Sequence, residues 1–453
     1  MIVCCPYRIA VRDCRFVTEK GKPPRRGGVE CGRMIRTIAI LGFLLAGAQS
    51  TTNARDELAN LRKQAHAERE AGDHAGYLRD ALKVRTLLNN YPSAILSVAR
   101  GYMEAGEIEK ALDALDAFAA LGQMDDGMID GSNKTFAALA DSPRYKAILG
   151  KFAQNKAPVS HAETAFSLSD PGLVAEDIDY DPVSKSFLIT SVLEKKIVRV
   201  SESGKLVYFA SSPSHWPMLA LKIDSARKVV WATEVALDGF TAAPKADWGK
   251  SAVLCFDYES GKLLRRIEGP AGAALGDLVL DAKGDPVISD GQKGGVYRLR
   301  DGSLQLLNGT EFISPQTAAM LPDGKHALVP DYLRGIGILD LNSSTVKWLD
   351  SGGTALNGVD GLYLHGGSLY LIQNGTSPER VVRLKLESSL ARVVSSEVIE
   401  RSTPTLGDPT HGVFVGDDFY YIANSGWSEL DDHGDLRAGG KLTPAQIMRF
   451  KAR

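Results

Sequence analysis

Short half-apolar segments alternate with tight turns from about residue 171 to the end of the chain. Six of these segments begin at a polar or small position and run into a turn, namely EDIDYDP, LALKIDS, GDLVLDAKG, QTAAMLPDG, DGLYLHGG and HGVFVGDD. Repeats of several short strands every 40 to 55 residues or so are typical of a β-propeller. The pattern therefore predicts a mainly-β fold, a six-bladed propeller over residues 160–453. The strand Thr164–Leu168 is predicted to pair with Gln446–Lys451 and close the ring.

One position in each repeat is expected to face the central channel. It lies at the start of the inner strand, and the starts of inner strands converge on the axis of a propeller. The six residues at this position are Glu176, Leu219, Gly276, Gln316, Asp360 and His411. Residues scattered along the sequence thus become one ring, which is where we look for function.

A helical period precedes the propeller. Apolar residues three and four apart predict helices over residues 55–156. The pairs Ala71-Gly72 and Ala105-Gly106 are 34 residues apart, which is the period of tetratricopeptide repeats. We expect a short tetratricopeptide-like domain here. It is either a groove for a protein partner or a helical cap packed on the propeller, and the small number of repeats favours the cap.

The first 48 residues predict an export signal. Residues 1–33 hold four of the five cysteines and show no periodic pattern. Residues 34–48 follow the order of a signal peptide, with a basic start, an apolar run and a small-x-small motif. We interpret residues 1–33 as mistranslated upstream sequence, Met34 as the true start, and the mature protein as periplasmic or secreted. The alternative is a cytosolic extension followed by a buried helix. A mature chain from about Gln49 would retain Cys255 alone and form no internal disulfide.

The overall charge and hydropathy exclude two classes of partner. The net charge is −2 over 453 residues, and no basic stripe indicates nucleic acid binding. No segment is long and apolar enough to predict a membrane span. A small molecule or a protein partner remains.

Three of the repeats resemble a known family. Glu176, Gln316 and Asp360, with the nearby segments DYDPVSKSFLITS, LPDGKHALVPD and LYLHGGSLYLIQN, are together similar to the senescence-marker-protein/gluconolactonase/luciferin-regenerating-enzyme superfamily. The resemblance covers residues 160–453. It implies a six-bladed propeller with a divalent cation on the channel axis, and it includes lactone hydrolases. Carried over position by position, it implies that Glu176, Gln316 and Asp360 are the metal ligands.

The chain departs from the family's pattern at two ring positions. Gly276 replaces the second Asn and offers no side chain, so its neighbour Asp277 is the polar group that we expect there, in contact with a substrate. His411 adds an imidazole that the pattern does not require. Oxygen ligands alone suit Ca²⁺, the cation we expect, or Mg²⁺. If His411 joins them, the preference shifts toward Zn²⁺ or Mn²⁺.

The function implied by the resemblance is metal-dependent hydrolysis of a lactone or small ester in the channel. Asp360 would accept a proton from the attacking water, and His411 is the second predicted catalytic residue. The alternative is a non-catalytic exported propeller that binds a ligand or a partner protein. Gly276 in place of Asn favours this alternative, whereas Glu176 and Asp360 favour hydrolysis.

Further features flank the predicted ring. His215 and Trp216, on the loop into blade 2, are predicted to contact a substrate, and an ordinary packed aromatic is the alternative for Trp216. The insertion Leu237–Lys250 is either a lid over the channel or a cover for the outer edge. The acidic segment Trp427–Asp435 predicts a solvated loop. Asn374 begins an Asn-Gly-Thr glycosylation sequence.

Overall fold

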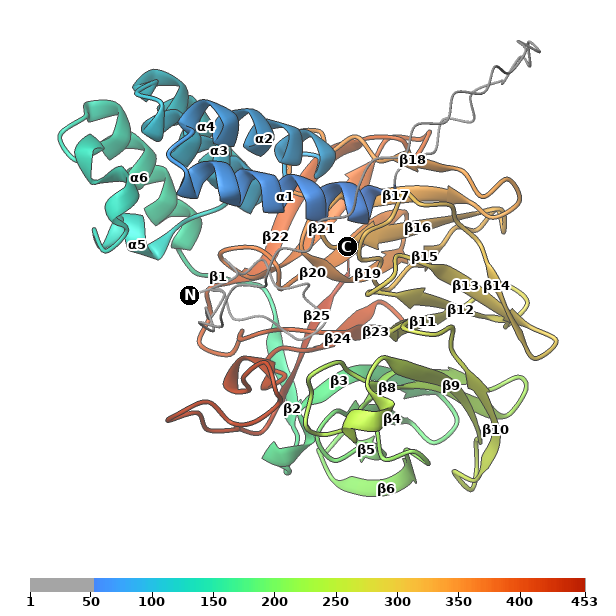
Figure 1. The fold of residues 1–453 in the computed structure, drawn as a ribbon. Coiled ribbons are helices and arrows are strands. Elements are labelled where there is room, and N and C mark those ends of the chain that lie inside the picture. The colour runs from blue at the N-terminus through green and yellow to red at the C-terminus, as the bar shows by residue number, and fades with distance from the viewer. Residues whose placement is uncertain (1–52, 453) are drawn as a thin grey trace, which may run out of the picture.

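The computed structural model describes residues 53–452, which form a helical segment followed by a six-bladed β-propeller (Figure 1). This confirms the predicted fold class. The predicted upstream extension and signal peptide lie outside the described residues. Within the described part of the chain, no helix is long and apolar enough to cross a membrane. Cys255 is a buried free thiol.

Each blade is a four-stranded antiparallel sheet whose strands follow one another outward from the channel. The inner strands are β3 (Ala175–Asp181), β7 (Met218–Asp224), β11 (Leu275–Leu280), β15 (Ala319–Met320), β19 (Val359–His365) and β23 (Gly412–Val415). The second strands are β4 (Ser186–Ser191), β8 (Val229–Ala236), β12 (Pro286–Asp290), β16 (His326–Asp331), β20 (Ser368–Gln373) and β24 (Asp418–Ile422). The third strands are β5 (Lys196–Ser201), β9 (Lys250–Asp257), β13 (Val296–Arg300), β17 (Gly335–Asp340), β21 (Arg380–Leu386) and β25 (Gln446–Lys451). The outer strands are β6 (Leu206–Ser211), β10 (Leu263–Glu268), β14 (Ser303–Leu306), β18 (Val346–Trp348), β22 (Val393–Arg401) and β2 (Glu163–Ser167).

The ring of blades is closed by strands from the two ends of the propeller. β2 pairs with β25, with Thr164 opposite Met448 and Phe166 opposite Ile447. This confirms the predicted closure. It completes the sixth blade with a strand that precedes the first, so opening the ring would break a backbone ladder. A further short strand, β1 (Val159–Ser160), pairs with β22 of blade 5.

The helical segment consists of consecutive antiparallel helices. They are α1 (Ala54–Glu70), α2 (His74–Leu87), α3 (Pro92–Glu104), α4 (Ile108–Ala120), α5 (Asp126–Ile129) and α6 (Pro143–Lys156), with a 3-10 turn at Lys134–Leu139. α1 and α3 each end in an Ala-Gly turn, in which Gly72 and Gly106 have φ of +73° and +75°. Glycine adopts this left-handed conformation without a steric cost, which explains its repetition at the 34-residue period.

Two arginines of blade 5 anchor the carboxyl ends of helices. Arg380 donates from Nη1 to the carbonyl of Leu121, just after α4, at 3.3 Å. Arg401 donates to the carbonyls of Ala157 and Gln154, at the end of α6, at 2.9 and 3.0 Å. The unpaired carbonyls and the macrodipole give a helix carboxyl end partial negative charge, so these guanidinium groups are favourably placed. Burial, followed by the charge of Arg401, lowers the pKa of Arg380 to about 10.

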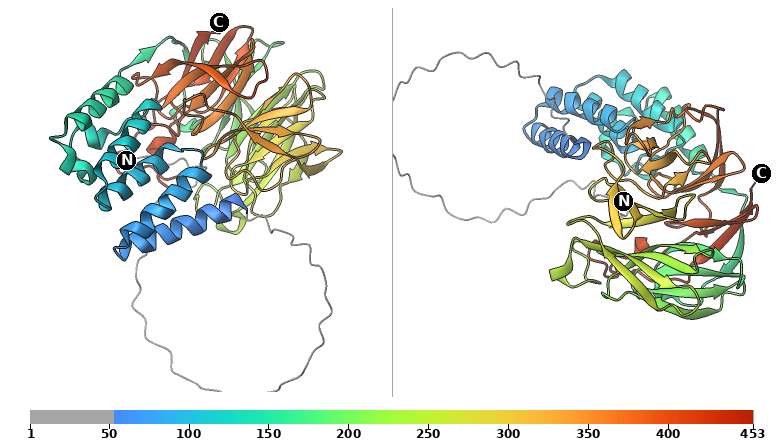
Figure 2. Two further views of the ribbon diagram at one scale, coloured as in Figure 1. Left: turned by 90° about the horizontal axis from the view of Figure 1, so that it is seen from above. Right: turned by 90° about the vertical axis from the view of Figure 1, so that its right-hand side faces the viewer.

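The helices pack on the face of the propeller where the inner strands begin. One apolar cluster joins the two parts; its buried members are Ala54, Leu58, Val84, Leu88, Tyr91 and Ala94 from the helices and Ile313, Tyr332 and Leu333 from the propeller. The views in Figures 1 and 2 agree that the helices lie beside blade 5 (orange) and away from blades 1 and 2 (green). The helical segment is therefore a cap over one side of the channel face.

Leu88→Ala tests this interface. Leu88 is fully buried in the shared cluster, so truncation should lower the free energy of unfolding by about 2–5 kcal/mol through lost apolar contact and a cavity. Leu264→Ala on the outer strand β10 is the matched control, because Leu264 is 49% exposed and should lose less than about 1 kcal/mol. Urea unfolding measures both, and equal losses in the two variants would contradict the interface.

Candidate functional site

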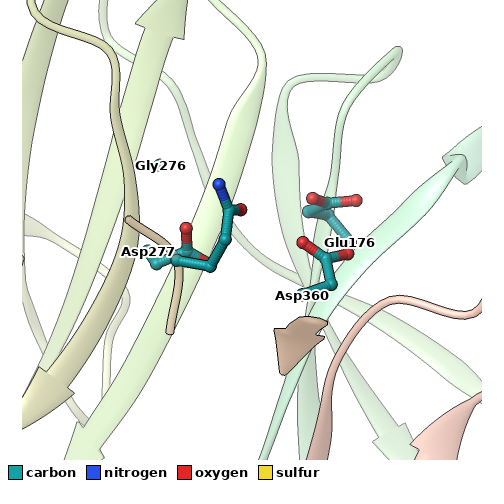
Figure 3. Close-up of a pocket in the computed structure, with 5 residues that line it drawn as sticks. Glu176, Gly276, Asp277 and Asp360 are labelled. Atoms are coloured by element: carbon teal, nitrogen blue, oxygen red, sulfur yellow. The ribbon is translucent and has the colours of Figure 1, made fainter. Parts of the chain in front are cut away.

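The inner strands bring five predicted or neighbouring residues around one narrow pocket in the channel. Its lining residues are Glu176, Gly276, Asp277, Gln316 and Asp360 (Figure 3). The pocket has room for little more than a water molecule or an ion. In Figure 3 the carboxylates of Glu176 and Asp360 lie side by side, and Asp277 lies across the pocket from them. Leu219 instead packs in an apolar cluster.

Glu176 and Asp360 form a buried pair of acids. Their exposed fractions are 6% and 9%, and one oxygen of each lies within 4.8 Å of the other and of a ring nitrogen of His411. Burial, followed by the charge of Asp360, raises the pKa of Glu176 to about 8. Two like charges this close and this poorly hydrated require either a shared proton or a bound cation.

Glu176 is held in place by a strained turn and by an indole. Val174, two residues before it, has a φ of +43°, a left-handed conformation that is unfavourable for a β-branched residue. The Val174 side chain is buried in the same apolar cluster as Trp427. Trp427 donates a hydrogen bond from its indole N–H to Oε2 of Glu176. The packing of this cluster therefore sets both the backbone and the carboxylate of Glu176.

Asp360 is held by an amide. Asn374, which follows strand β20, donates from Nδ2 to Oδ2 of Asp360 at 2.6 Å and to the carbonyl of Pro409 at 2.9 Å. Neighbouring strands of a blade are antiparallel, so the end of β20 lies next to the start of β19. The Asn-Gly-Thr sequence therefore serves a buried contact here, because Asn374 is only 4% exposed.

Gln316 offers an oxygen to the pocket. Its Nε2 donates to the carbonyl and the hydroxyl of Ser314 at 3.2 and 3.1 Å. With the nitrogen held there, the carbonyl oxygen is the end of the side chain that is available to a ligand in the pocket. A carbonyl oxygen beside two carboxylates suits a hard divalent cation.

His411 is fixed by hydrogen bonds at both ring nitrogens. Nδ1 donates to the backbone carbonyl of Glu176 at 2.9 Å, and Nε2 lies 2.8 Å from both Oδ1 of Asp277 and Oγ1 of Thr317. Burial opposes a charge on this ring, but the hydrogen bond with Asp277 and the surrounding carboxylates raise the pKa of His411 well above its usual value. An imidazolium with both N–H groups engaged has no lone pair for a metal or a proton. This arrangement therefore makes His411 the hydrogen-bonded partner of Asp277.

Two insertions meet over the blade 1, 2 and 6 side of the channel. Phe240, from the insertion Leu237–Lys250, lies 5.9 Å from Trp427 between ring centroids, and both are essentially fully buried. The backbone N–H of Thr241 donates to the carbonyl of His433 at 2.7 Å. The Leu237–Lys250 insertion thus lies over the channel as a lid. The predicted solvated loop is wrong for Trp427, which the lid buries, whereas His433 and Asp435 are exposed.

His215 and Trp216 lie outside the pocket lining. His215 is exposed. Trp216 is 4% exposed and packs with Ala236 and Ala243. Its indole N–H donates to Asp247 at 3.3 Å, so this aromatic is held within the blade 2 insertion. Neither residue is brought to the pocket in this arrangement.

Sequence reasoning missed three residues that orient the site. Trp427 stood in an acidic insertion, Asn374 was noted only for its glycosylation pattern, and Thr317 was passed over beside Gln316. Thr317 donates to Oδ1 of Asp277 at 2.6 Å. A signal existed for two of them. A tryptophan in a polar loop needs something to cover it, and Asn374 directly follows β20, the strand next to the inner strand of blade 5.

Comparison with known proteins relates this chain to other propellers by fold. No family model and no curated protein matches the sequence. Among solved structures, an aldose sugar dehydrogenase with bound PQQ from Streptomyces coelicolor is 13% identical (TM-score 0.45; 65% of this chain and 99% of that one). A gluconolactonase from Xanthomonas campestris is 14% identical (TM-score 0.45; 66% and 93%). A calcium-binding protein, regucalcin, from Agrobacterium tumefaciens is 15% identical (TM-score 0.45; 66% and 97%).

A luciferin-regenerating enzyme and a streptogramin B lyase also match. A gluconolactonase and a luciferin-regenerating enzyme are thus among the proteins of similar fold. These likenesses concern the fold. Function has to be argued from the residues of the site.

The buried acid pair predicts that the cation-free protein loses stability as pH rises. The folded state keeps a proton on Glu176 up to a pKa of about 8, whereas the unfolded chain releases it near the ordinary value of 4.5. The folded state therefore binds more protons in between, and the free energy of unfolding falls with rising pH. Between pH 6 and 8 this residue should account for a fall of about 1–3 kcal/mol.

Glu176→Gln removes this titration and is the comparison variant. Urea unfolding in the presence of a chelator at pH 6 and pH 8 should show a smaller fall for Glu176→Gln than for the parent. Asp179, whose pKa is raised to about 6 chiefly by burial, remains in both proteins, and so does His411, whose pKa is also raised. The difference between the two falls therefore isolates Glu176, and identical falls would contradict the burial of an acid pair.

Proposed function

We propose that this chain hydrolyses a small lactone or ester at the channel site, with a divalent cation held by Glu176, Asp360 and Gln316. The observation that carries the proposal is the buried acid pair beside an amide oxygen. These three groups supply hard oxygen ligands around a space of ionic size. Water would complete the coordination shell.

The charges around the pocket also favour a divalent cation. Glu176, Asp277 and Asp360 are three carboxylates, and the imidazolium of His411 offsets one of them. Two negative charges remain to be balanced, which is the charge of one divalent cation. The nearby Asp177 does not change this balance, because it is paired with Lys222 at 2.8 Å. We propose Ca²⁺ as the cation, since the available ligands are oxygens and the ring nitrogens of His411 are engaged elsewhere.

A bound divalent cation polarises an ester carbonyl and lowers the pKa of a water molecule. Asp360 supplies the base, because its carboxylate lines the pocket and Asn374 orients it. His411 contributes a fixed positive charge rather than a proton acceptor, because both of its nitrogens already act as hydrogen-bond donors. Asp277 holds that charge in place at 2.8 Å.

Access to the pocket limits the substrate. The helical cap covers the face over blades 4 and 5, and the Leu237–Lys250 lid, whose Phe240 packs on Trp427, covers the opposite side. A substrate larger than an ion needs the lid to move away from Glu176. The proposed substrate is therefore small, and Trp427 would leave its hydrogen bond with Glu176 when the substrate enters.

The small size of the pocket favours a second candidate function. A propeller that holds a cation or a small ligand without turning it over needs no substrate path, and its buried site would stabilise the fold. The two candidates share the cation site and differ in turnover. In the second, the helical repeats supply a docking surface for a protein partner.

Metal content and hydrolysis, measured on the same preparations, test the proposal. The purified protein should carry or take up about one equivalent of divalent cation, and the double variant Glu176→Ala/Asp360→Ala should take up none. Asp360→Asn should lower hydrolysis in a lactone and ester screen by at least about 100-fold. Asp340→Asn, at the last residue of β17, is the matched control and should leave both readouts unchanged.

The outcomes separate the candidates. A bound cation with no hydrolysis of any lactone or ester favours the non-catalytic propeller. No cation at any stoichiometry after dialysis against Ca²⁺, Mn²⁺ or Zn²⁺ contradicts the site itself.

A further inference from the structure

The helical cap contacts the propeller through two loops on the channel face. The first follows β16 in blade 4. There Tyr332 and Leu333 pack against Leu88 and Tyr91, from the connection between α2 and α3. Asn357, just before β19, donates from Nδ2 to the carbonyls of Leu88 and Leu333 at 3.2 and 2.8 Å. This contact lies beside the strand that carries Asp360.

The second contact lies on the loop between β20 and β21 in blade 5. Met124, after α4, donates its backbone N–H to the carbonyl of Ser377 at 2.7 Å. The N–H of Ser377 donates in return to Oε1 of Gln123 at 3.1 Å. Arg380 adds its bond to the helix end at Leu121. The connection between α4 and α5 is therefore hydrogen-bonded in both directions to this loop.

Both contacts converge on Asn374. Tyr332, from the first loop, donates its hydroxyl to Oδ1 of Asn374 at 3.2 Å. Asn374 is also the first residue of the second loop. Its two N–H groups go to Asp360 and to the carbonyl of Pro409. The amide thus has its donors and its acceptor engaged, and it connects the cap to one acid of the pocket.

The residues around the Tyr332–Asn374 contact are tightly packed. A Cβ added to Gly375 would lie 2.4 Å from the ring and hydroxyl of Tyr332 and 2.6 Å from Gly358. Glycine at these two positions lets the Tyr332 ring and the Asn374 loop approach closely. The neighbouring residues have no room to adjust, so a displacement of the Tyr332 ring would move Asn374.

We propose that Tyr332 and Asn374 are positioning residues through which the docked helical cap fixes the carboxylate of Asp360. Tyr332 acts through Asn374 and does not line the pocket. The cap is then part of the site, because undocking it frees the loops that hold one of the acids. This inference rests on the proposed function for what Asp360 does, but the positioning itself is a separate structural statement.

Cation affinity of the full-length chain is the main readout. Ca²⁺ and Mn²⁺ are titrated by calorimetry into the parent, Asn374→Leu, Tyr332→Phe and Leu88→Ala. Groups that orient a metal ligand typically change affinity by 10- to 100-fold, so Asn374→Leu should weaken binding by about 10- to 100-fold. Tyr332→Phe, one bond further away, should weaken it by about 3- to 10-fold. Leu88→Ala should also weaken cation binding, because Leu88 packs in the cluster that holds Tyr332.

Tyr421→Phe is the matched control. Tyr421 is a fully buried tyrosine whose hydroxyl donates to Glu400 in blade 5. Its loss should lower the unfolding temperature without changing cation affinity. A purely structural role for Tyr332 would give the same result as Tyr421→Phe, and that result would overturn the inference while leaving the cation site intact.

Hydrogen exchange keeps the test decisive if the parent binds no cation. That outcome contradicts the proposed function, but it does not test whether Tyr332 and Asn374 position Asp360. Positioning then predicts that Tyr332→Phe loses amide protection at residues 359–361 and 374–376 relative to the parent and to Tyr421→Phe. Unchanged protection in both segments would overturn it.

Discussion

The burial of Glu176 and Asp360 side by side, where the inner strands converge, is the constraint to which the surrounding structure responds. Two carboxylates in so little water repel each other and raise the pKa of Glu176. Neighbouring groups supply hydrogen bonds to both acids. The indole of Trp427 donates to Glu176, and the amide of Asn374 donates to Asp360. These bonds orient the acids but add no positive charge. The arrangement therefore remains poised for a proton or a cation.

Next to the two acids lies a third carboxylate, Asp277, which contacts a histidine. His411 and Asp277 form a buried hydrogen-bonded pair at 2.8 Å, and Thr317 bonds the same carboxylate. The imidazole occupies a ring position that could have supplied a metal ligand. Its hydrogen bonds instead direct both nitrogens into the protein. Because a buried charge is tolerated only when paired, His411 and Asp277 depend on each other, and the remaining oxygens define what the pocket can hold.

The elements that cover the channel face also contact the groups that hold the two acids. Trp427, which the lid buries, bonds Glu176 on the blade 1, 2 and 6 side, and the cap approaches Asp360 from the blade 4 and 5 side. Glu176 is thus bonded from the blade 6 insertion, and Asp360 from a blade 5 loop that the cap contacts. Both acids are consequently at most 9% exposed, and the pocket between them is small. This arrangement also makes the helical segment more than an appendage, since its two contacts meet at Asn374.

The sequence by itself determined the repeat, and with it the six blades, the closing strand and the ring positions. Alternating polarity and turn residues act over a few neighbours, so they survive without tertiary information. It also indicated the helical cap through the 34-residue step from Gly72 to Gly106. Only the tertiary structure decided which ring groups are engaged elsewhere, such as His411. It alone placed Asn374 and Trp427 on the acids and the cap on the channel face. These depend on contacts between residues up to 269 positions apart, and no local pattern encodes such contacts.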